Sequence, residues 1–289
     1  MLLYRIAILA FGVFACSTAV IMIKLTDLHP VLLAGYRLLV ASLVLGPLWA
    51  RARRRYRGQY GAGDLKRSLL PGILLGLHFI SWIVGARMTL AANASLIVNM
   101  VPVAMPFLSY FLVRELINRG EVAGTLLVLV GVACLGAADY HVSLETFTGD
   151  VICFCSMLLF AGYLALARKN RGVPDLWLYI VPVYAVAGLF CLLVSFFFVN
   201  PVQVYSQKDV LLIVGLAVVP TVIGHSSLQY SMKHLRVQVA AIGTLGQFVF
   251  AGTLAFIILG EVPGWAFYLA ASLLVAGATI AIRATPSTP

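Results

Sequence analysis

Two histidines lie in long apolar stretches of the sequence, and each has polar neighbours at helical spacing. His78 precedes Trp82 by four residues, and His225 lies four residues from both Thr221 and Gln229. Residues three or four apart share one face of a helix. Such side chains are rare in membrane spans and usually face the interior of the bundle. They predict either cavity residues that bind a substrate carboxylate or amide, or neutral histidines hydrogen-bonded between helices.

Three more polar residues complete the predicted substrate site. Asn99 is interpreted equally well as a substrate ligand or as a hydrogen-bonding partner between helices. Gln247 is expected to line the cavity, because a neutral amide in the middle of a span needs partners. Tyr163 fits a substrate ligand, and it fits an anchor at the membrane interface better. The predicted substrate-binding set is His78, Trp82, Asn99, Tyr163, His225, Gln229 and Gln247.

Four prolines are predicted to distort helices near this site. Pro102 and Pro106 follow Asn99 and lie one turn apart, whereas Pro182 and Pro220 lie in later apolar stretches. A proline removes a backbone donor and frees a carbonyl, which membranes tolerate where the backbone faces a cavity or other protein. We expect kinks at all four positions, and rocking points at Pro182 and Pro220.

Arg37 is the one charged residue expected deep within a span. It lies about two turns from the outer end of its helix, close enough for its long side chain to reach the surface. Glu261 is expected at a similar depth and is therefore the predicted partner. The pair is interpreted either as an outer gate or as a static brace.

Other kinds of chemistry find no support in the sequence. The acidic residues, Asp139 and Asp150 among them, fall in loops or at helix ends, so the usual carboxylate route to proton or sodium coupling is not expected. The cysteines lack a second Cys or His pair that would complete a metal site. No Gly-rich phosphate loop is present, so ATP is not expected to drive the protein. We predict no cofactor, no metal and no catalytic residue.

The composition defines the elements that must position these residues. Of the 289 residues, 62% are hydrophobic and 10% are charged, whereas soluble domains are roughly 45–50% apolar and about 25% charged. A helix needs about 20 apolar residues to cross a bilayer. The apolar runs predict ten transmembrane helices, at residues 4–23, 31–50, 69–87, 94–113, 121–138, 149–167, 176–199, 210–231, 238–259 and 265–283.

The basic residues predict the orientation of the chain. Most of the Lys and Arg residues outside the spans fall on one side, many of them in the loop at residues 51–67. Those on the other side are Lys24, Arg87 and Lys208. Because basic loops prefer the cytoplasm, both termini are predicted to be cytoplasmic in a bacterial inner membrane. Lipid is thus an expected partner, and nucleic acid is not.

The two halves of the sequence resemble each other. Glu115 precedes Gly131 by sixteen residues, Glu261 precedes Gly277 by the same spacing, and the two pairs are offset by 146 residues. Because each half holds five spans, the second half must enter the membrane from the opposite side. We expect a five-helix repeat at residues 1–140 and an inverted repeat at residues 141–289, an arrangement typical of secondary carriers.

These features make the chain similar to the EamA-type family of the drug/metabolite transporter superfamily. The matching motifs are Ala34-Gly35-Tyr36-Arg37, the stretch from Ala91 to Ser95 with Pro102, Arg114-Glu115 and Gly260-Glu261. The resemblance implies ten helices in two inverted repeats and a central cavity lined chiefly by the first, third, fourth, sixth, eighth and ninth. It also implies export of amino acids or related metabolites. In the first span, Phe14-Ala15-Cys16-Ser17 replaces the Trp-Gly that such families often carry.

The sequence therefore predicts an all-α membrane protein that exports a small molecule by alternating access and is not an enzyme. An uncoupled facilitator or channel for small polar or aromatic solutes is the alternative. A membrane-embedded enzyme acting on lipid fits less well, because it needs paired carboxylates or a nucleophile with its base. Small residues in the fifth and tenth spans indicate close packing within the bundle, with a homodimer through these helices as the alternative.

Overall fold

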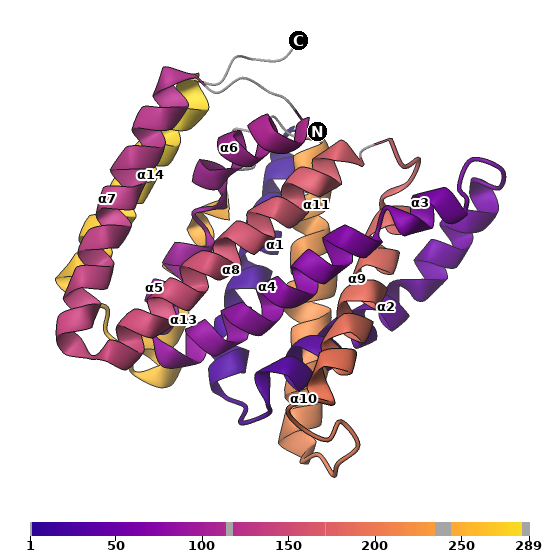
Figure 1. Ribbon diagram of the computed structural model, residues 1–289, viewed down its shortest axis with the longest axis horizontal. Helices are drawn as coiled ribbons and strands as arrows, with labels where there is room; N and C mark the ends of the chain where they lie inside the picture. The colour runs from indigo at the N-terminus through magenta and orange to yellow at the C-terminus, as the bar shows by residue number, and fades with distance from the viewer. Residues whose placement is uncertain (1, 114–117, 171, 235–243, 285–289) are drawn as a thin grey trace.

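The computed structural model describes residues 2–113, 118–170, 172–234 and 244–284, and in these ranges the chain is helical without a strand (Figure 1). The first half contains α1 (Leu2–Lys24), α2 (Pro30–Arg55), the short α3 (Ala62–Lys66), α4 (Leu69–Met88), α5 (Ala91–Val98), α6 (Val101–Val113) and α7 (Arg119–Val142). The second half contains α8 (Leu144–Lys169), α9 (Leu176–Ser195), α10 (Gln207–Leu216), η1 (Ala217–His225), α11 (Ser226–His234), α13 (Gly246–Leu259) and α14 (Trp265–Ala284).

The helices match the predicted spans. Seven helical stretches of the described chain are long and apolar enough to cross a membrane, and Gly246–Leu259 and Trp265–Ile280 are shorter apolar helices. With the pair α5 and α6, they correspond one to one to the predicted spans, so the prediction of an all-α membrane protein with ten spans is confirmed. Residues 238–243 of the ninth predicted span lie outside the described residues.

The fourth span is broken in its middle. Helix α5 ends at Val98 and α6 begins at Val101. Pro102 is the second residue of α6, where a helix needs no backbone donor and proline is favoured. Helix α6 continues through the position of Pro106, and the side chains of both prolines lie outside the described part. The break leaves Asn99 between two short helices.

The two halves pack closely against each other, and the main contacts between them have counterparts in which the equivalent helices of the two halves are interchanged. Helix α2 packs against its counterpart α9, α7 against α14, and α5 against α13. The contact of α4 with α8 is matched by that of η1 and α11 with α1. Figure 1 shows the pair α7 and α14 at one edge of the bundle and the pair α2 and α9 toward the other. The helices between these pairs come from both halves, so the centre of the bundle is shared.

Glycines bring the backbones close where these matched pairs cross. A Cβ on Gly224 of η1 would lie 3.0 Å from the backbone nitrogen of Cys16 in α1, and one on Gly12 would lie 3.2 Å from the Gly224 carbonyl. A Cβ on Gly85 of α4 would lie 2.8 Å from the carbonyl of Gly149 in α8. Backbones approach this closely only where no side chain stands between them.

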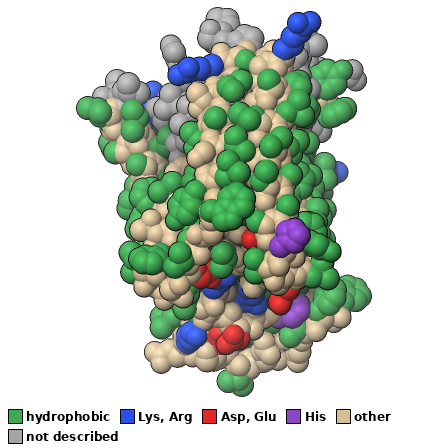
Figure 2. All heavy atoms as spheres, turned by 90° about the vertical axis from the view of Figure 1, so that its left-hand side faces the viewer, with side chains coloured by type: hydrophobic (Ala, Val, Ile, Leu, Met, Phe, Trp, Pro, Cys, Tyr) green, Lys and Arg blue, Asp and Glu red, His purple; other side chains and the backbone are tan. Residues whose placement is uncertain are grey.

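The outer face of α7 and α14 is apolar over most of its height. Figure 2 shows hydrophobic side chains between basic groups at one end and a group of charged and histidine side chains nearer the other. Exposed residues on these two helices include Leu126, Val130, Tyr268, Leu269 and Val275. Small residues instead face the partner helix, since a Cβ on Gly131 would lie 3.2 Å from Ala270 Cα. The small-residue patterns of these helices are thus used within the bundle, as the packing interpretation predicts.

Candidate substrate site at the centre of the bundle

An arginine lies in the centre of the bundle, fully covered by neighbouring helices. Arg37 of α2 is 0% exposed. Its Nε donates a hydrogen bond to Thr221 Oγ1 of η1 at 2.7 Å, and its Cζ lies 4.1 Å from the ring centre of Phe79 in α4. Both halves of the chain therefore contact one guanidinium group.

The π-helical segment η1 explains how Thr221 reaches Arg37. Pro220 has no backbone N–H, so it cannot bond to the Leu216 carbonyl four residues earlier. The hydroxyl of Thr221 donates to that carbonyl instead, at 2.8 Å, which leaves its oxygen free to accept from Arg37. The segment from Ala217 to His225 widens into a π-helix around the proline, a distortion that is frequent at functional sites.

Pro182 lies inside α9, which continues through it.

Aromatic rings surround the guanidinium. The rings of His78 and Phe160 are stacked with their centres 4.6 Å apart, and Trp82 lies parallel to His78 at 6.2 Å. His225 contacts the edges of Phe79 and Phe160, each at 5.8 Å. The two predicted histidines thus share two aromatic neighbours. His225 and Phe160 remain partly exposed, whereas Phe79 is 1% exposed and Arg37 is 0% exposed.

Hydrogen bonds fix His78 against α8. Its Nδ1 lies 3.0 Å from the Ser156 carbonyl and 2.9 Å from Ser156 Oγ, and that hydroxyl donates to the His78 carbonyl at 2.8 Å. A carbonyl only accepts, so we place the ring hydrogen on Nδ1. The Nε2 of His78 then remains an acceptor.

Two other predicted site residues meet in the same region. Gln229 Nε2 donates to Tyr163 Oη at 3.2 Å, and the Tyr163 ring stacks on Phe160 at 5.9 Å. Tyr163 is 1% exposed, so its position does not fit an anchor at the membrane interface. Sequence reasoning gave no role to Phe79 or Phe160, because an aromatic residue in an apolar span gives no signal of its own.

The remaining predicted ligands lie at the margin of this cluster. Asn99 is the C-cap of α5, and its Nδ2 bonds locally to the Ser95 carbonyl at 2.7 Å. Gln247 is half-buried at the start of α13, and its backbone carbonyl accepts from Ser17 Oγ at 3.1 Å. Among the described residues, neither side chain contacts the aromatic rings through a ring contact or a hydrogen bond, so their placement in the site stays a prediction.

The predicted pair of Arg37 and Glu261 is not formed. Glu261 follows the last residue of α13 and Gly260, and its carboxylate pairs with Lys24 at 2.8 Å. Arg37 instead points inward to Thr221. The expectation failed because the position of Arg37 along its helix indicates depth but not the direction in which its side chain turns.

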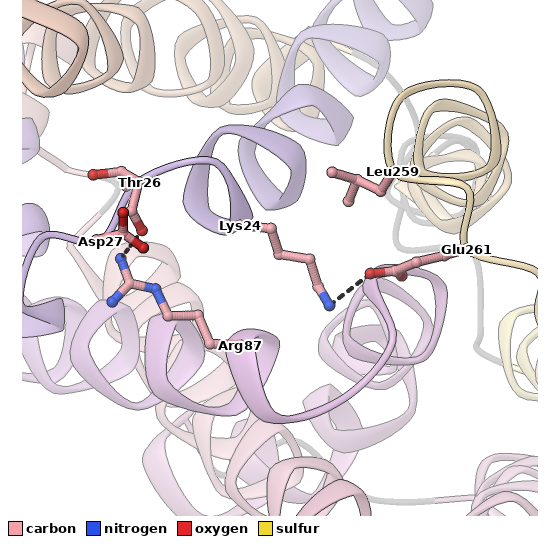
Figure 3. Close-up of a pocket in the computed structure, with 6 residues that line it drawn as sticks. All are labelled: Lys24, Thr26, Asp27, Arg87, Leu259 and Glu261. Atoms are coloured by element: carbon pink, nitrogen blue, oxygen red, sulfur yellow. Dashed lines mark hydrogen bonds and ion pairs between the residues drawn. The ribbon is translucent and has the colours of Figure 1, made fainter.

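Lys24 and Glu261 connect four helix ends beside a pocket of about 460 Å³ (Figure 3). We call the end of the bundle that holds this pocket the pocket end. Besides their ion pair, Lys24 Nζ donates to the Thr89 carbonyl and Glu261 accepts from the Ala91 backbone N–H, each at 2.7 Å. These contacts join the end of α1 to the α4–α5 turn and to the end of α13. Across the pocket, Arg87 Nη2 donates to the Thr26 carbonyl at 2.8 Å.

Two acidic residues expected at helix ends prove to be buried. Asp139 is 9% exposed and Asp150 is 4% exposed, and the two side chains lie next to each other. Asn93 Nδ2 donates to Asp139 Oδ2 at 2.6 Å. The sequence could not indicate this burial, because it depends on how α7 and α8 fold back against α5.

Comparisons with known proteins agree with this architecture. The sequence profile of the EamA-like transporter family matches residues 3–137 and 147–283. A protein of Archaeoglobus fulgidus described as an uncharacterized transporter is 25% identical over 270 residues, which cover 92% of each chain. A solved crystal structure superimposes with a TM-score of 0.67 and 19% identity over 96% of each chain, and shows the same fold.

Proposed function

Because the chain belongs to the EamA-like transporter family, we propose that it is a secondary carrier that exports a small metabolite, an amino acid or a related compound, by alternating access. The observation that carries this proposal is the cluster around Arg37, to which both repeats contribute polar and aromatic side chains. Carriers built from inverted repeats bind substrate between the halves near the middle of the membrane. The described residues offer no cluster of His, Cys, Asp and Glu that suits a metal.

The pocket end supplies the second element that a carrier needs, a closure that can open. The Lys24–Glu261 pair, with its bonds to Thr89 and Ala91, holds α1, α13 and the α4–α5 turn together. Breaking this pair would free these helix ends without disturbing the packing around Arg37. We assign the gate to Lys24 and Glu261 in place of the predicted pair with Arg37.

Orientation follows from the basic residues. The start of α1 and the end of α14 lie at the end of the bundle opposite the pocket (Figure 1). The basic loop at residues 51–67 lies at that same end, as the position of α3 indicates. With the basic end in the cytoplasm, the pocket end faces the outside of a bacterial inner membrane, and export ends at the Lys24–Glu261 gate.

Counterflow in proteoliposomes tests the carrier. Vesicles that contain the full chain are loaded with an unlabelled amino acid, nucleobase or polyamine, and uptake of the labelled compound is followed. A carrier gives saturable uptake that internal substrate accelerates, whereas a channel or facilitator gives no acceleration. His225→Ala is expected to lower the rate at least about tenfold, because the loss of a polar contact to the substrate in a largely buried site weakens binding strongly. Leu269→Ala on the outer face of α14 is the control. Absence of exchange for every compound, with folded protein, would contradict the proposal.

A further inference from the structure

The charge of Arg37 has no counter-ion among the described residues. Its Nε is bonded to Thr221, but Nη1 and Nη2 are buried and make no hydrogen bond to any described group. The ion pairs in the described chain join Lys24 to Glu261 and Asp64 to Arg67. A buried charge is stable only when it is paired and hydrogen-bonded. The site therefore holds two strong donors that are built to receive an anion.

The described residues around Arg37 add donors and do not add a carboxylate. Trp82 Nε1 and Tyr184 Oη are also buried without a hydrogen-bond partner. The Trp82 ring centre lies 6.0 Å from Arg37 Cζ, and Tyr184 belongs to α9, which packs against α2. Phe79 covers one face of Arg37 through a cation–π contact. A positively charged ligand would find a like charge here and no acidic side chain.

The aromatic rings determine which kind of ligand can carry the anionic group. Phe79 lies between Arg37 and His225, and Phe160 touches both histidines. The partly exposed rings of His225 and Phe160 form the accessible edge of the cluster. A flat apolar body fits this edge by stacking, and its charged end reaches the guanidinium once Phe79 moves aside, since Phe79 is 1% exposed and Arg37 is 0% exposed.

We propose that Arg37 is the receptor for the carboxylate of the transported compound, and that the substrate class is a carboxylate with a flat apolar body. The inference rests on the proposed carrier function and narrows its substrate. The two Nη groups match the two oxygens of a carboxylate in a fork-to-fork pair. Because no described acidic side chain lies at Arg37 to bind an ammonium group, the carboxylate is required and the amine of an amino acid is dispensable.

Three compounds with the same ring separate these requirements. 3-Phenylpropionate carries only the carboxylate, phenylalanine carries both charges, and phenethylamine carries only the ammonium. Binding to the purified full chain in nanodiscs is measured by calorimetry and by the shift in unfolding temperature. We expect 3-phenylpropionate to bind at least as well as phenylalanine, and phenethylamine to bind about 100-fold more weakly or not at all.

Substitutions at Arg37 test whether the guanidinium is responsible. Arg37→Gln is expected to weaken 3-phenylpropionate binding about 100-fold, and Arg37→Lys about tenfold, because lysine keeps the charge and loses the fork. Thr221→Val removes the partner of Nε and leaves Nη1 and Nη2 in place, so its effect is expected to be smaller than that of Arg37→Gln. If Arg37→Gln does not fold, the ligand series on the unaltered protein and Arg37→Lys decide the question.

The outcomes for the receptor and for the carrier are distinct. Equal binding of phenethylamine, binding that survives Arg37→Gln, or binding of chloride with no preference for the aryl carboxylate would overturn the receptor. Arg37-dependent binding of 3-phenylpropionate without counterflow would support the receptor and contradict the carrier. Counterflow that does not depend on Arg37 would support the carrier and contradict the receptor.

Discussion

Neutralising Glu261 should open the pocket end of the bundle. Glu261→Gln keeps the size of the side chain and one acceptor for the Ala91 N–H, but removes the charge that holds Lys24 at 2.8 Å. The two side chains are only 15% and 17% exposed, so water screens the pair less than it screens a surface pair. The substitution therefore acts on the closure of this end and leaves the centre of the bundle intact.

The size of the effect follows from the geometry of the pair. Two unit charges about 4 Å apart at an effective dielectric of 20 attract by about 4 kcal/mol, before the cost of removing them from water. Hydrogen bonds to charged groups contribute about 1.5–3 kcal/mol net. Taking about 2 kcal/mol for the pair, its loss shifts the equilibrium between closed and open ends about 30-fold.

Labelling of a cysteine in the pocket measures this shift. Leu259 lines the pocket, and Leu259→Cys in a chain freed of its native cysteines should react faster with an impermeant maleimide when this end opens further. Glu261→Gln and Lys24→Met should each raise the labelling rate about 10- to 100-fold. The double variant should label no faster than either single one, because both remove the same interaction.

The exposed pair Asp64–Arg67 provides the matched control, since it joins residues three apart on the surface. Asp64→Asn should leave the labelling rate unchanged, because exposed pairs of this kind contribute about 0.2–1 kcal/mol and lie away from the pocket. The reasoning would be refuted by equal labelling in the unaltered chain and in Glu261→Gln, or by additive effects of the two substitutions.

Two other substitutions test η1, one at its contact with α1 and one at its contact with Arg37. Gly224→Ala places a Cβ 2.6 Å from Cys16 Sγ and should lower the free energy of unfolding by about 1–3 kcal/mol. Gly46→Ala is the control, because a Cβ there has nothing within 4 Å. Equal unfolding temperatures of the two variants would contradict the close approach of α1 and η1. Pro220→Ala restores a backbone N–H that competes with the Thr221 hydroxyl for the Leu216 carbonyl. The rate of counterflow should therefore fall about tenfold, while the unfolding temperature stays the same or rises. An unchanged rate would mean that Thr221 does not position Arg37.

The spans and the repeat were predictable because a bilayer imposes strong rules on sequence. About 20 apolar residues are required for each crossing, and the offset of 146 residues relates motifs whose distance along the chain is readable directly. The two histidines could be placed in the bundle for the same reason, since polar residues in lipid are costly. Their common neighbours Phe79 and Phe160 could not, because aromatic residues are equally frequent on faces that contact lipid or protein.

The sequence could not show in which direction these polar side chains point or which residues they contact. The sequence places Arg37 within a span, but whether its side chain turns toward the surface or the centre depends on the position of η1. Asp139 and Asp150 were placed near helix ends, but their burial depended on the packing of α7 and α8 against α5. In each case a contact between distant parts of the chain made the difference, and a single sequence carries no record of such a contact.

The two matched helix crossings differ in stiffness. The offset of 146 residues relates His78 directly to Gly224, and Ser156 to Gly12 within a turn. The crossing of α4 and α8 is fastened by the hydrogen bonds of His78 and Ser156, whereas that of α1 and η1 is a bare glycine contact with a thiol bond from Cys16 to the Pro220 carbonyl at 3.6 Å. Fewer side-chain hydrogen bonds therefore have to break for α1 to move against η1 than for α4 to move against α8. This difference predicts that movement between the halves occurs more readily between α1 and η1 than between α4 and α8.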